Sequence, residues 1–180
     1  MAVKNKTKTT GYKIQHALRE LAHRREIAEN QFRTNLATFP DEAKQKPVDL
    51  DMRLLRIERV VAGLQVLQAR YNLAVSCDVP GFGEKLTLHD CVKLVGAYGR
   101  AEKRWRSAAK EDEPSRGYYA HEKTRDRDAV VSSRTVPTET AVEMATTYGR
   151  RASALREAIQ IGNTTELEFE GVSDLFEFVS

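Results

Sequence analysis

The sequence lacks the long apolar runs that membrane-spanning segments need. The longest uncharged helical stretch, Val60 to Ala69, is interrupted by Gln65 and Gln68, and a membrane helix takes roughly 18 apolar residues or more. The first residues, "MAVKNKTKTTGYK", are basic, but no apolar segment follows them, which is not the pattern of a secretory signal. We therefore expect a cytoplasmic chain that does not interact with membranes.

Cysteine and histidine are scarce and are not spaced as metal ligands. With no export signal, the two cysteines, Cys77 and Cys91, are expected to be reduced thiols. His16 and His23 share a helix face, but seven residues of helix separate them by about 10 Å, so they cannot bind one metal ion. The HExxH, CxxC and EF-hand spacings do not occur in the sequence. We predict no metal and no cofactor.

The sequence also lacks a recognisable catalytic set. His89, Asp90 and Cys91 are consecutive, and consecutive helical residues point about 100° apart, so their side chains cannot converge as in a thiol protease. "GFGEK", from Gly81 to Lys85, does not have the GxxxxGK[ST] spacing of a phosphate loop and is interpreted as a turn. We predict no catalytic residues, although an enzyme of unrecognised type remains an alternative.

What the chain does contain is charge, and the charge is unevenly distributed. Of 180 residues, 31% are charged and only 7% are aromatic, and the net charge is +3. Residues 164–180 hold five acidic residues and no lysine or arginine, so the rest of the chain holds 29 basic and 21 acidic residues. The acidic segment either covers a basic patch, on its own chain or on a neighbouring one, or is a solvated terminus.

Apolar periodicity predicts four long helices in an all-α bundle. The first covers Tyr12 to about Leu36, and the second has a heptad seam of Leu50, Leu54, Ile57, Val61, Leu64, Gln68 and Tyr71. The third begins near Thr87, where Asp90 three residues later resembles a capping box. The fourth runs from Thr138 to about Ile161. Because Val60 and Leu67 widen the apolar stripe of the second helix, we expect it to have partners on more than one side.

Two short extended segments and three regions complete the predicted organisation. "AVVSSRTVP" is rich in β-branched residues, and "ELEFEGV" alternates acidic and apolar residues, which is typical of a strand. We assign residues 1–11 to a flexible basic arm, 12–163 to the helical domain and 164–180 to an acidic C-terminal tail.

An ordered set of segments resembles the septicolysin-like family of bacterial proteins. The set consists of a seam helix ending in "RYNLAV", a turn with "GEKLTLHDC", a polar loop with "AVVSSRTVP", and a last helix leading to "REAIQIGNTTEL". The resemblance runs from about Leu50 to Leu167. It implies a small all-helical protein that forms homo-oligomers, and it implies no activity and no catalytic residues. The chain departs from the family pattern where Asn163, not an aromatic residue, precedes "TTEL", and where the tail extends beyond Leu167.

Basic and aromatic side chains alternate in the third helix and in the loop that follows it. Guanidinium groups interleaved with aromatic rings can bind phosphates and stack on bases. Lys85, beside the start of the third helix, offers a weaker anion site, because a helix start has unpaired N–H groups. The ordinary alternative is that Trp105 packs in the core and the arginines pair with nearby acids. The predicted ligand-binding residues are Lys85, Thr87, Arg100, Lys103, Arg104, Arg106, Tyr118, Tyr119, His121, Arg125 and Arg127.

These observations favour a binding protein over an enzyme. Our first hypothesis is a non-catalytic homo-oligomer that binds a nucleotide, a cyclic nucleotide or a nucleic acid through its basic region. The second is a purely structural oligomer in which the basic loop of one subunit pairs with the acidic tail of another. The sequence leaves the size of the oligomer open, and also whether Asn35 and Asn72 cap their helices or contact a ligand.

Overall fold

The predicted all-α fold with four long helices is confirmed. The structure is a computed structural model that describes residues 6–36, 46–110 and 136–179. Its long helices are α1 (Gly11–Leu36), α2 (Pro47–Ala74), α3 (Leu88–Lys110) and α4 (Thr138–Thr164), and a short helix, α5 (Ser173–Glu177), follows near the end. Four short strands accompany them: β1 (Lys6–Thr9), β2 (Ser76–Cys77), β3 (Leu86–Thr87) and β4 (Leu167–Glu170).

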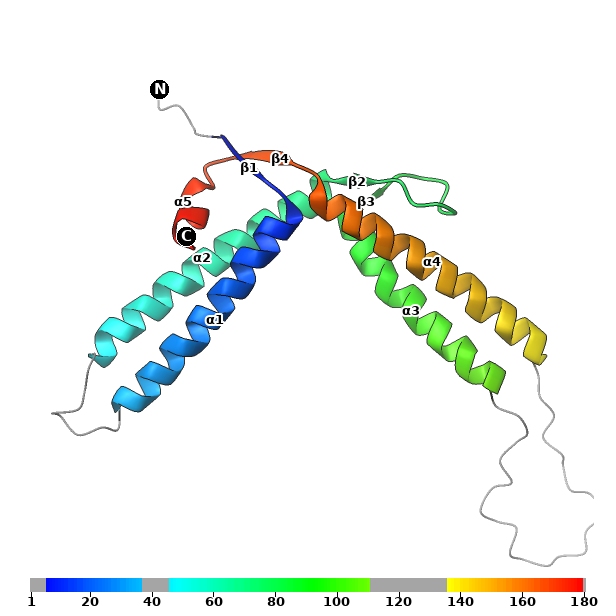
Figure 1. Cartoon of the computed structure of the whole chain (residues 1–180), viewed down its shortest axis with the longest axis horizontal. Coiled ribbons are helices and arrows are strands. Elements are labelled where there is room, and N and C mark those ends of the chain that lie inside the picture. The colour runs from blue at the N-terminus through cyan, green and yellow to red at the C-terminus, as the bar shows by residue number, and fades with distance from the viewer. Residues whose placement is uncertain (1–5, 37–45, 111–135, 180) are drawn as a thin grey trace, which may run out of the picture.

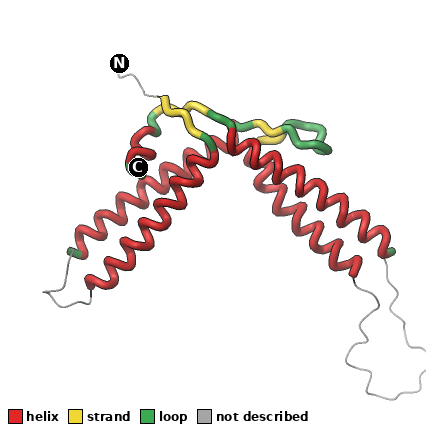
Figure 2. The backbone as a smooth tube through the Cα atoms, in the orientation of Figure 1, coloured by secondary structure: helices red, strands yellow, loops and turns green. Residues whose placement is uncertain are grey.

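The four long helices pack as two antiparallel pairs that diverge from a shared apex (Figure 1). We call these pairs the α1–α2 arm and the α3–α4 arm. Contacts between the arms are sparse compared with those inside each arm, and Figure 2 shows the arms separating below the strands. Each long helix therefore has one long partner helix along most of its length.

The predicted seam of α2 is its buried face. Leu50, Ile57, Leu64 and Tyr71 are at most 2% exposed, and Leu54, Val61 and Gln68 are partly buried between them. These residues pack on the matching face of α1, which buries Ile14, Ala17, Leu21 and Ala28. The heptad spacing thus describes an antiparallel two-helix contact inside one chain.

The apex joins the two arms through a buried tyrosine. The hydroxyl of Tyr71 lies 2.7 Å from the carbonyl oxygens of both Gly162 and Thr165, at the end of α4, and donates to them. Burial raises the pKa of Tyr71, and a hydrogen bond with the backbone of Gly11 opposes that rise. A side chain at Gly11 would collide with Asn163 Oδ1. The first turn of α1, the last turn of α2 and the last turn of α4 therefore fit together only with glycine at position 11.

The assignment of residues 1–11 to a flexible arm was wrong for Lys6 to Thr9, which form β1. This strand pairs antiparallel with β4 and places Lys6 opposite Glu170 and Lys8 opposite Glu168. Thr9 is fully buried. A four-residue strand of lysine and threonine has little β signal of its own, and its partner lies about 160 residues away in the sequence. The predicted strand in "ELEFEGV" is confirmed as β4.

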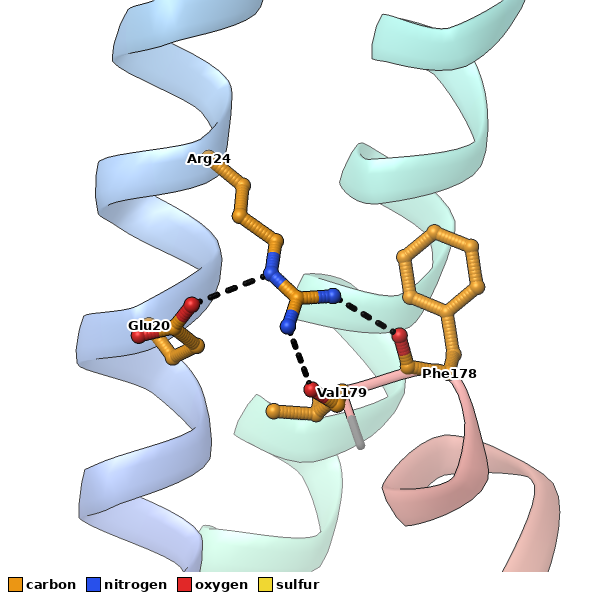
Figure 3. A network of polar contacts seen from close by, with 4 residues as sticks. All are labelled: Glu20, Arg24, Phe178 and Val179. Atoms are coloured by element: carbon orange, nitrogen blue, oxygen red, sulfur yellow. Dashed lines mark hydrogen bonds and ion pairs between the residues drawn. The ribbon is translucent and has the colours of Figure 1, made fainter.

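The acidic tail is part of the folded structure. Phe169 and Val172 are buried in the common core, and Leu175 of α5 lies over Gly63 of α2, where a Cβ atom would be only 2.7 Å from it. Arg24 of α1 donates to the carbonyl oxygens of Phe178 and Val179, at 3.2 and 2.6 Å, while its Nε contacts Glu20 (Figure 3). Among the described residues, the tail contacts β1 and the α1–α2 arm.

The other predicted strand, "AVVSSRTVP", lies almost wholly outside the described residues. The helix boundaries agree with the predictions to within a few residues: α3 begins directly after Thr87, and α4 begins at Thr138. At the end of α1, the side chain of Asn35 donates to the carbonyl oxygen of Gln31 at 2.7 Å. The side chain of Asn35 thus forms a hydrogen bond within its own helix. Asn72, near the end of α2, is partly buried.

Candidate anion-binding surface of the α3–α4 arm

The positive charge of the α3–α4 arm is concentrated on α3. This helix carries six lysines and arginines but only two acidic residues, Asp90 and Glu102. Five of its basic residues fall within residues 100–110, which extend over about 15 Å of helix. The predicted residues Arg100, Lys103, Arg104 and Arg106 all belong to this segment and are exposed.

Three of these residues form one outer face of α3. Arg100, Lys103 and Arg104 recur at helical spacing, and with Ser107 and Ala108 they line a hollow of about 460 Å³. Among the residues that the structure describes, the three cations have no ion-pair partner within 4.0 Å. Their charges are therefore available to a ligand from solution.

A second hollow, of about 500 Å³, lies between α3 and α4. The antiparallel pairing brings Arg106 of α3 beside Arg150 and Arg156 of α4, so three guanidinium groups line this groove together with the carboxylate of Glu102. Three cations and one anion give the groove a local excess of two positive charges. Sequence reasoning missed Arg150 and Arg156, because their proximity to α3 depends on how the two helices are aligned.

The single carboxylate of the groove has a structural role. Glu102 is bound to Arg106 one turn away, and its side chain is 20% exposed. A Cβ atom at Gly149 would lie 3.3 Å from the Glu102 carboxyl group, so the absence of a side chain there lets the carboxylate rest against α4. Glu102 consequently neutralises about one of the three arginines of the groove.

Three aromatic side chains, from the turn before β3, from α3 and from α4, contact one another on this arm. Phe82 meets Tyr98 edge to face at 5.4 Å, and Tyr98 lies 5.8 Å from Tyr148. The guanidinium of Arg151 lies 5.8 Å above the Tyr98 ring, a cation–π geometry. These rings are partly buried, as is Trp105, so the basic face of α3 is not interleaved with freely exposed aromatic rings in the way that the sequence suggested.

Lys85 and Thr87 lie apart from the basic segment. About 13 residues of helix separate Thr87 from Arg100, which corresponds to about 20 Å. The start of α3 is also occupied by its own carboxylate: the Thr87 hydroxyl donates to Asp90 Oδ2 at 2.6 Å, and the Thr87 N–H donates to the same atom at 3.1 Å. These bonds, that of the hydroxyl first, lower the pKa of Asp90. The predicted capping box is present, and the carboxylate of Asp90 is the anion that binds at the start of α3.

The five remaining predicted residues lie outside the described part of the chain. They are Tyr118, Tyr119, His121, Arg125 and Arg127. Their participation in a ligand site stays a prediction. In sequence they begin eight residues after Lys110, the last residue of α3.

The two cysteines are buried near the apex. Both Cys77 and Cys91 are free thiols, and Cys91 is fully buried. Burial, with the neighbouring Cys77, raises the pKa of Cys91 to about 12, so it remains a neutral thiol at ordinary pH. This agrees with the interpretation of Cys91 as a small core residue. Within the described ranges, no three metal-ligating side chains cluster.

Comparison of the chain with family models, curated proteins and solved structures returns no match. The resemblance to the septicolysin-like family therefore stays a prediction based on the order of its segments. Among the helices that the structure describes, none combines the length and the apolar character needed to cross a membrane.

Proposed function

We propose that the protein is a non-catalytic binding protein whose α3–α4 arm binds the phosphate backbone of a single-stranded nucleic acid. The observation that carries this proposal is the set of six cations on neighbouring surfaces of one arm: Arg100, Lys103, Arg104, Arg106, Arg150 and Arg156. Only Arg106 of these has an ion-pair partner among the described residues.

The extent of the surface favours a polyanion over a single nucleotide. The basic segment of α3 is about 15 Å long, and the outer face and the groove are two separate open hollows. One phosphate group could contact only a few of the six cations, whereas a strand carrying a phosphate on every residue could contact them together. The binding of nucleotides and cyclic nucleotides is therefore the second outcome that the test must distinguish.

The experiment is a fluorescence anisotropy titration with a labelled 12-nucleotide single strand at several salt concentrations. For single strands, the slope of log K against log salt is about −0.7 for each phosphate neutralised. We expect the triple variant Arg100→Ala, Lys103→Ala, Arg104→Ala to make this slope shallower by about 2. Competition with mono- and cyclic nucleotides should require far higher concentrations than competition with the unlabelled strand.

The matched control removes three exposed arginines from the other arm: Arg19→Ala, Arg33→Ala, Arg53→Ala. It changes the net charge by the same amount and should leave the slope within experimental error. Equal effects of the two triple variants would show that only net charge matters. Absence of binding by the wild-type protein at 20 mM salt would refute the proposal, and a mononucleotide that competes as well as the strand would replace the polyanion with a nucleotide.

The alternative of a structural oligomer, held together by basic loops and acidic tails of different subunits, has a structural cost. The tail already pairs with β1 and receives hydrogen bonds from Arg24. To reach a neighbouring subunit it would have to leave these contacts, so we place this alternative second.

A further inference from the structure

Helix α2 has a second apolar stripe, which the heptad seam does not include. Its positions follow one another at steps of 4, 3, 4, 3, 4, 3 and 4 and hold Val48, Met52, Leu55, Arg59, Ala62, Val66, Ala69 and Leu73. Seven of these eight residues are apolar, and all eight are exposed. The stripe extends over about 38 Å of helix.

This stripe lies on the side of α2 opposite the seam that packs on α1. Each of its positions is two residues from a seam position, such as Met52 from Leu50 or Val66 from Leu64, which is a rotation of about 200° around the helix axis. Val48, Met52, Leu55, Val66 and Leu73 are between 53% and 72% exposed and make up five of the eleven exposed large hydrophobic residues in the described part of the chain. A heptad stripe of this kind is the surface that a second helix packs on.

We propose that this stripe is a homodimer interface in which the α2 helices of two copies pack antiparallel about a two-fold axis between residues 60 and 61. The inference does not rest on the anion-binding function, because it concerns the other arm. An isologous contact of this type requires a surface that is complementary to itself, and the sequence of the stripe meets that requirement in side-chain size and in charge.

The sizes of the side chains match in the antiparallel register. With the axis between residues 60 and 61, Met52 lies opposite Ala69 of the second copy, Leu55 opposite Val66, and Val48 opposite Leu73. Arg59, the one charged residue of the stripe, lies opposite Ala62, which leaves room for its long side chain. A polar residue at one seam position is a known means of fixing the register of helices in a coiled coil.

The charges beside the stripe match in the same register. Asp49 and Arg70 each directly follow a stripe residue, so they flank the stripe on the same side. Residues of this flank meet each other between two antiparallel helices, and in this register Asp49 of one copy faces Arg70 of the other. On the other flank, Asp51 faces Asn72 and Glu58 faces Gln65, so like charges do not face each other along either flank. A parallel dimer would exchange the Asp49–Arg70 pair for a pair between Asp51 and Arg56, but it would place Arg59 directly opposite Arg59. The charge pattern therefore favours the antiparallel dimer.

The tail helix lies on one flank of the stripe. In the antiparallel register, Arg56 of the second copy lies opposite Gly63, on which α5 packs through Leu175. The exposed residues next to Leu175 in α5 include the carboxylates of Asp174 and Glu177. Arg56 of the second copy would therefore meet α5, the helix that carries these two carboxylates, at this position of the interface.

The first test is the mass of the full chain in solution, measured by light scattering at 5 to 100 µM. We expect twice the chain mass of 20.3 kDa for the wild-type protein and the monomer mass for Val66→Glu, which places two carboxylates in the apolar stripe of the dimer. The matched control is Ile161→Glu, since Ile161 on α4 is 63% exposed and Val66 is 62% exposed. Circular dichroism verifies that both variants keep their helical content.

The second test examines the orientation of the two helices. Asp49→Arg should weaken dimerisation roughly tenfold, because it replaces two attractive pairs per dimer by repulsive ones. The double variant Asp49→Arg, Arg70→Asp should restore most of the lost affinity, since the pair is then reversed rather than broken.

Three results would overturn the inference. The first is a monomeric wild-type protein at 100 µM, and the second is a Val66→Glu variant that remains dimeric, which would mean that another surface or another segment of the chain carries the contact. The third is a double charge variant that dimerises no better than Asp49→Arg alone, which would refute the antiparallel register.

Discussion

The two arms have similar lengths and connect to the same apex, but only the α1–α2 arm has an ion pair between its two helices among the described residues. In the α1–α2 arm, Arg24 and Arg25 are bound within the chain: Arg24 to Glu20, and Arg25 to both Glu29 and Glu58. In the α3–α4 arm, the basic residues of α3 other than Arg106 have no such partner among the described residues. The α1–α2 arm thus has one ion pair that joins its two helices, Arg25 with Glu58, whereas the one ion pair among the described residues of the α3–α4 arm lies within α3.

The cores of the arms differ as well. The α1–α2 arm buries large aliphatic side chains such as Leu21, Ile57 and Leu64, whereas the α3–α4 arm buries mostly small ones such as Ala101 and Ala152. Small side chains let two backbones approach closely, and α3 packs along α4 more extensively than α1 packs along α2. The difference suggests a division of labour, with self-association on the α1–α2 arm and anion binding on the α3–α4 arm.

The largest effect on stability is expected from a larger side chain in the core of the α3–α4 arm. Ala152 is fully buried, so Ala152→Leu should lower the free energy of unfolding by about 1–3 kcal/mol, because the closely packed helices must move apart. Urea denaturation provides the measurement. The control is Ala22→Leu on α1, at an exposed position, which should change stability by less than about 0.5 kcal/mol. If the two variants were equally stable, the close packing of this arm would be disproved.

A smaller effect is expected at the start of α3, the helix that begins at the apex with a capping box. The first residues of α2 and α4, at the far ends of the arms, have no side-chain cap hydrogen bond. Thr87→Ala should therefore destabilise the protein by about 1 kcal/mol at pH 7, and the pKa of Asp90, measured by NMR, should rise toward the ordinary carboxyl value.

The pH dependence of this cap follows from the lowered pKa of Asp90. The stabilisation is complete above the pKa of an unfolded aspartate, about 3.9, and it is lost as the pH falls through the lower pKa of the folded state. The stability difference between the wild-type protein and Thr87→Ala should thus shrink when it is measured near pH 2 to 3. A difference that stays the same down to pH 2 would mean that the carboxylate contributes nothing to the cap.

The helices could be predicted from the sequence because their signals are local. The seam of α2 repeats every three or four residues, and Thr87 with Asp90 marks the start of α3 within a single turn. The basic segment of α3 could be predicted for the same reason, because its residues are close in the sequence. The contribution of Arg150 and Arg156 to the groove could not, because it depends on the alignment of two helices whose connection spans 27 residues.

The features that sequence reasoning missed depend on contacts between distant parts of the chain. The strand β1 forms by pairing with β4, and the Tyr71 hydroxyl is hydrogen-bonded to carbonyl groups 91 and 94 residues away. The second stripe of α2 was present in the sequence, as Met52, Leu55 and Val66 show, but the expectation of further partners for this helix was based on Val60 and Leu67, beside the seam. Once α1 is seen to cover only the seam, the opposite stripe becomes a separate surface.

The most direct test of the division between the arms is the salt dependence of nucleic-acid binding by the Val66→Glu variant. A 12-nucleotide strand is used because a short strand limits bridging between the subunits of the wild-type dimer. We expect the variant to be monomeric and to show the same slope of log K against log salt as the wild-type protein, since the six cations of the α3–α4 arm are unchanged. A slope shallower by about 2, as expected for the α3 triple variant, would contradict the division, because it would mean that binding requires the interface of the α1–α2 arm.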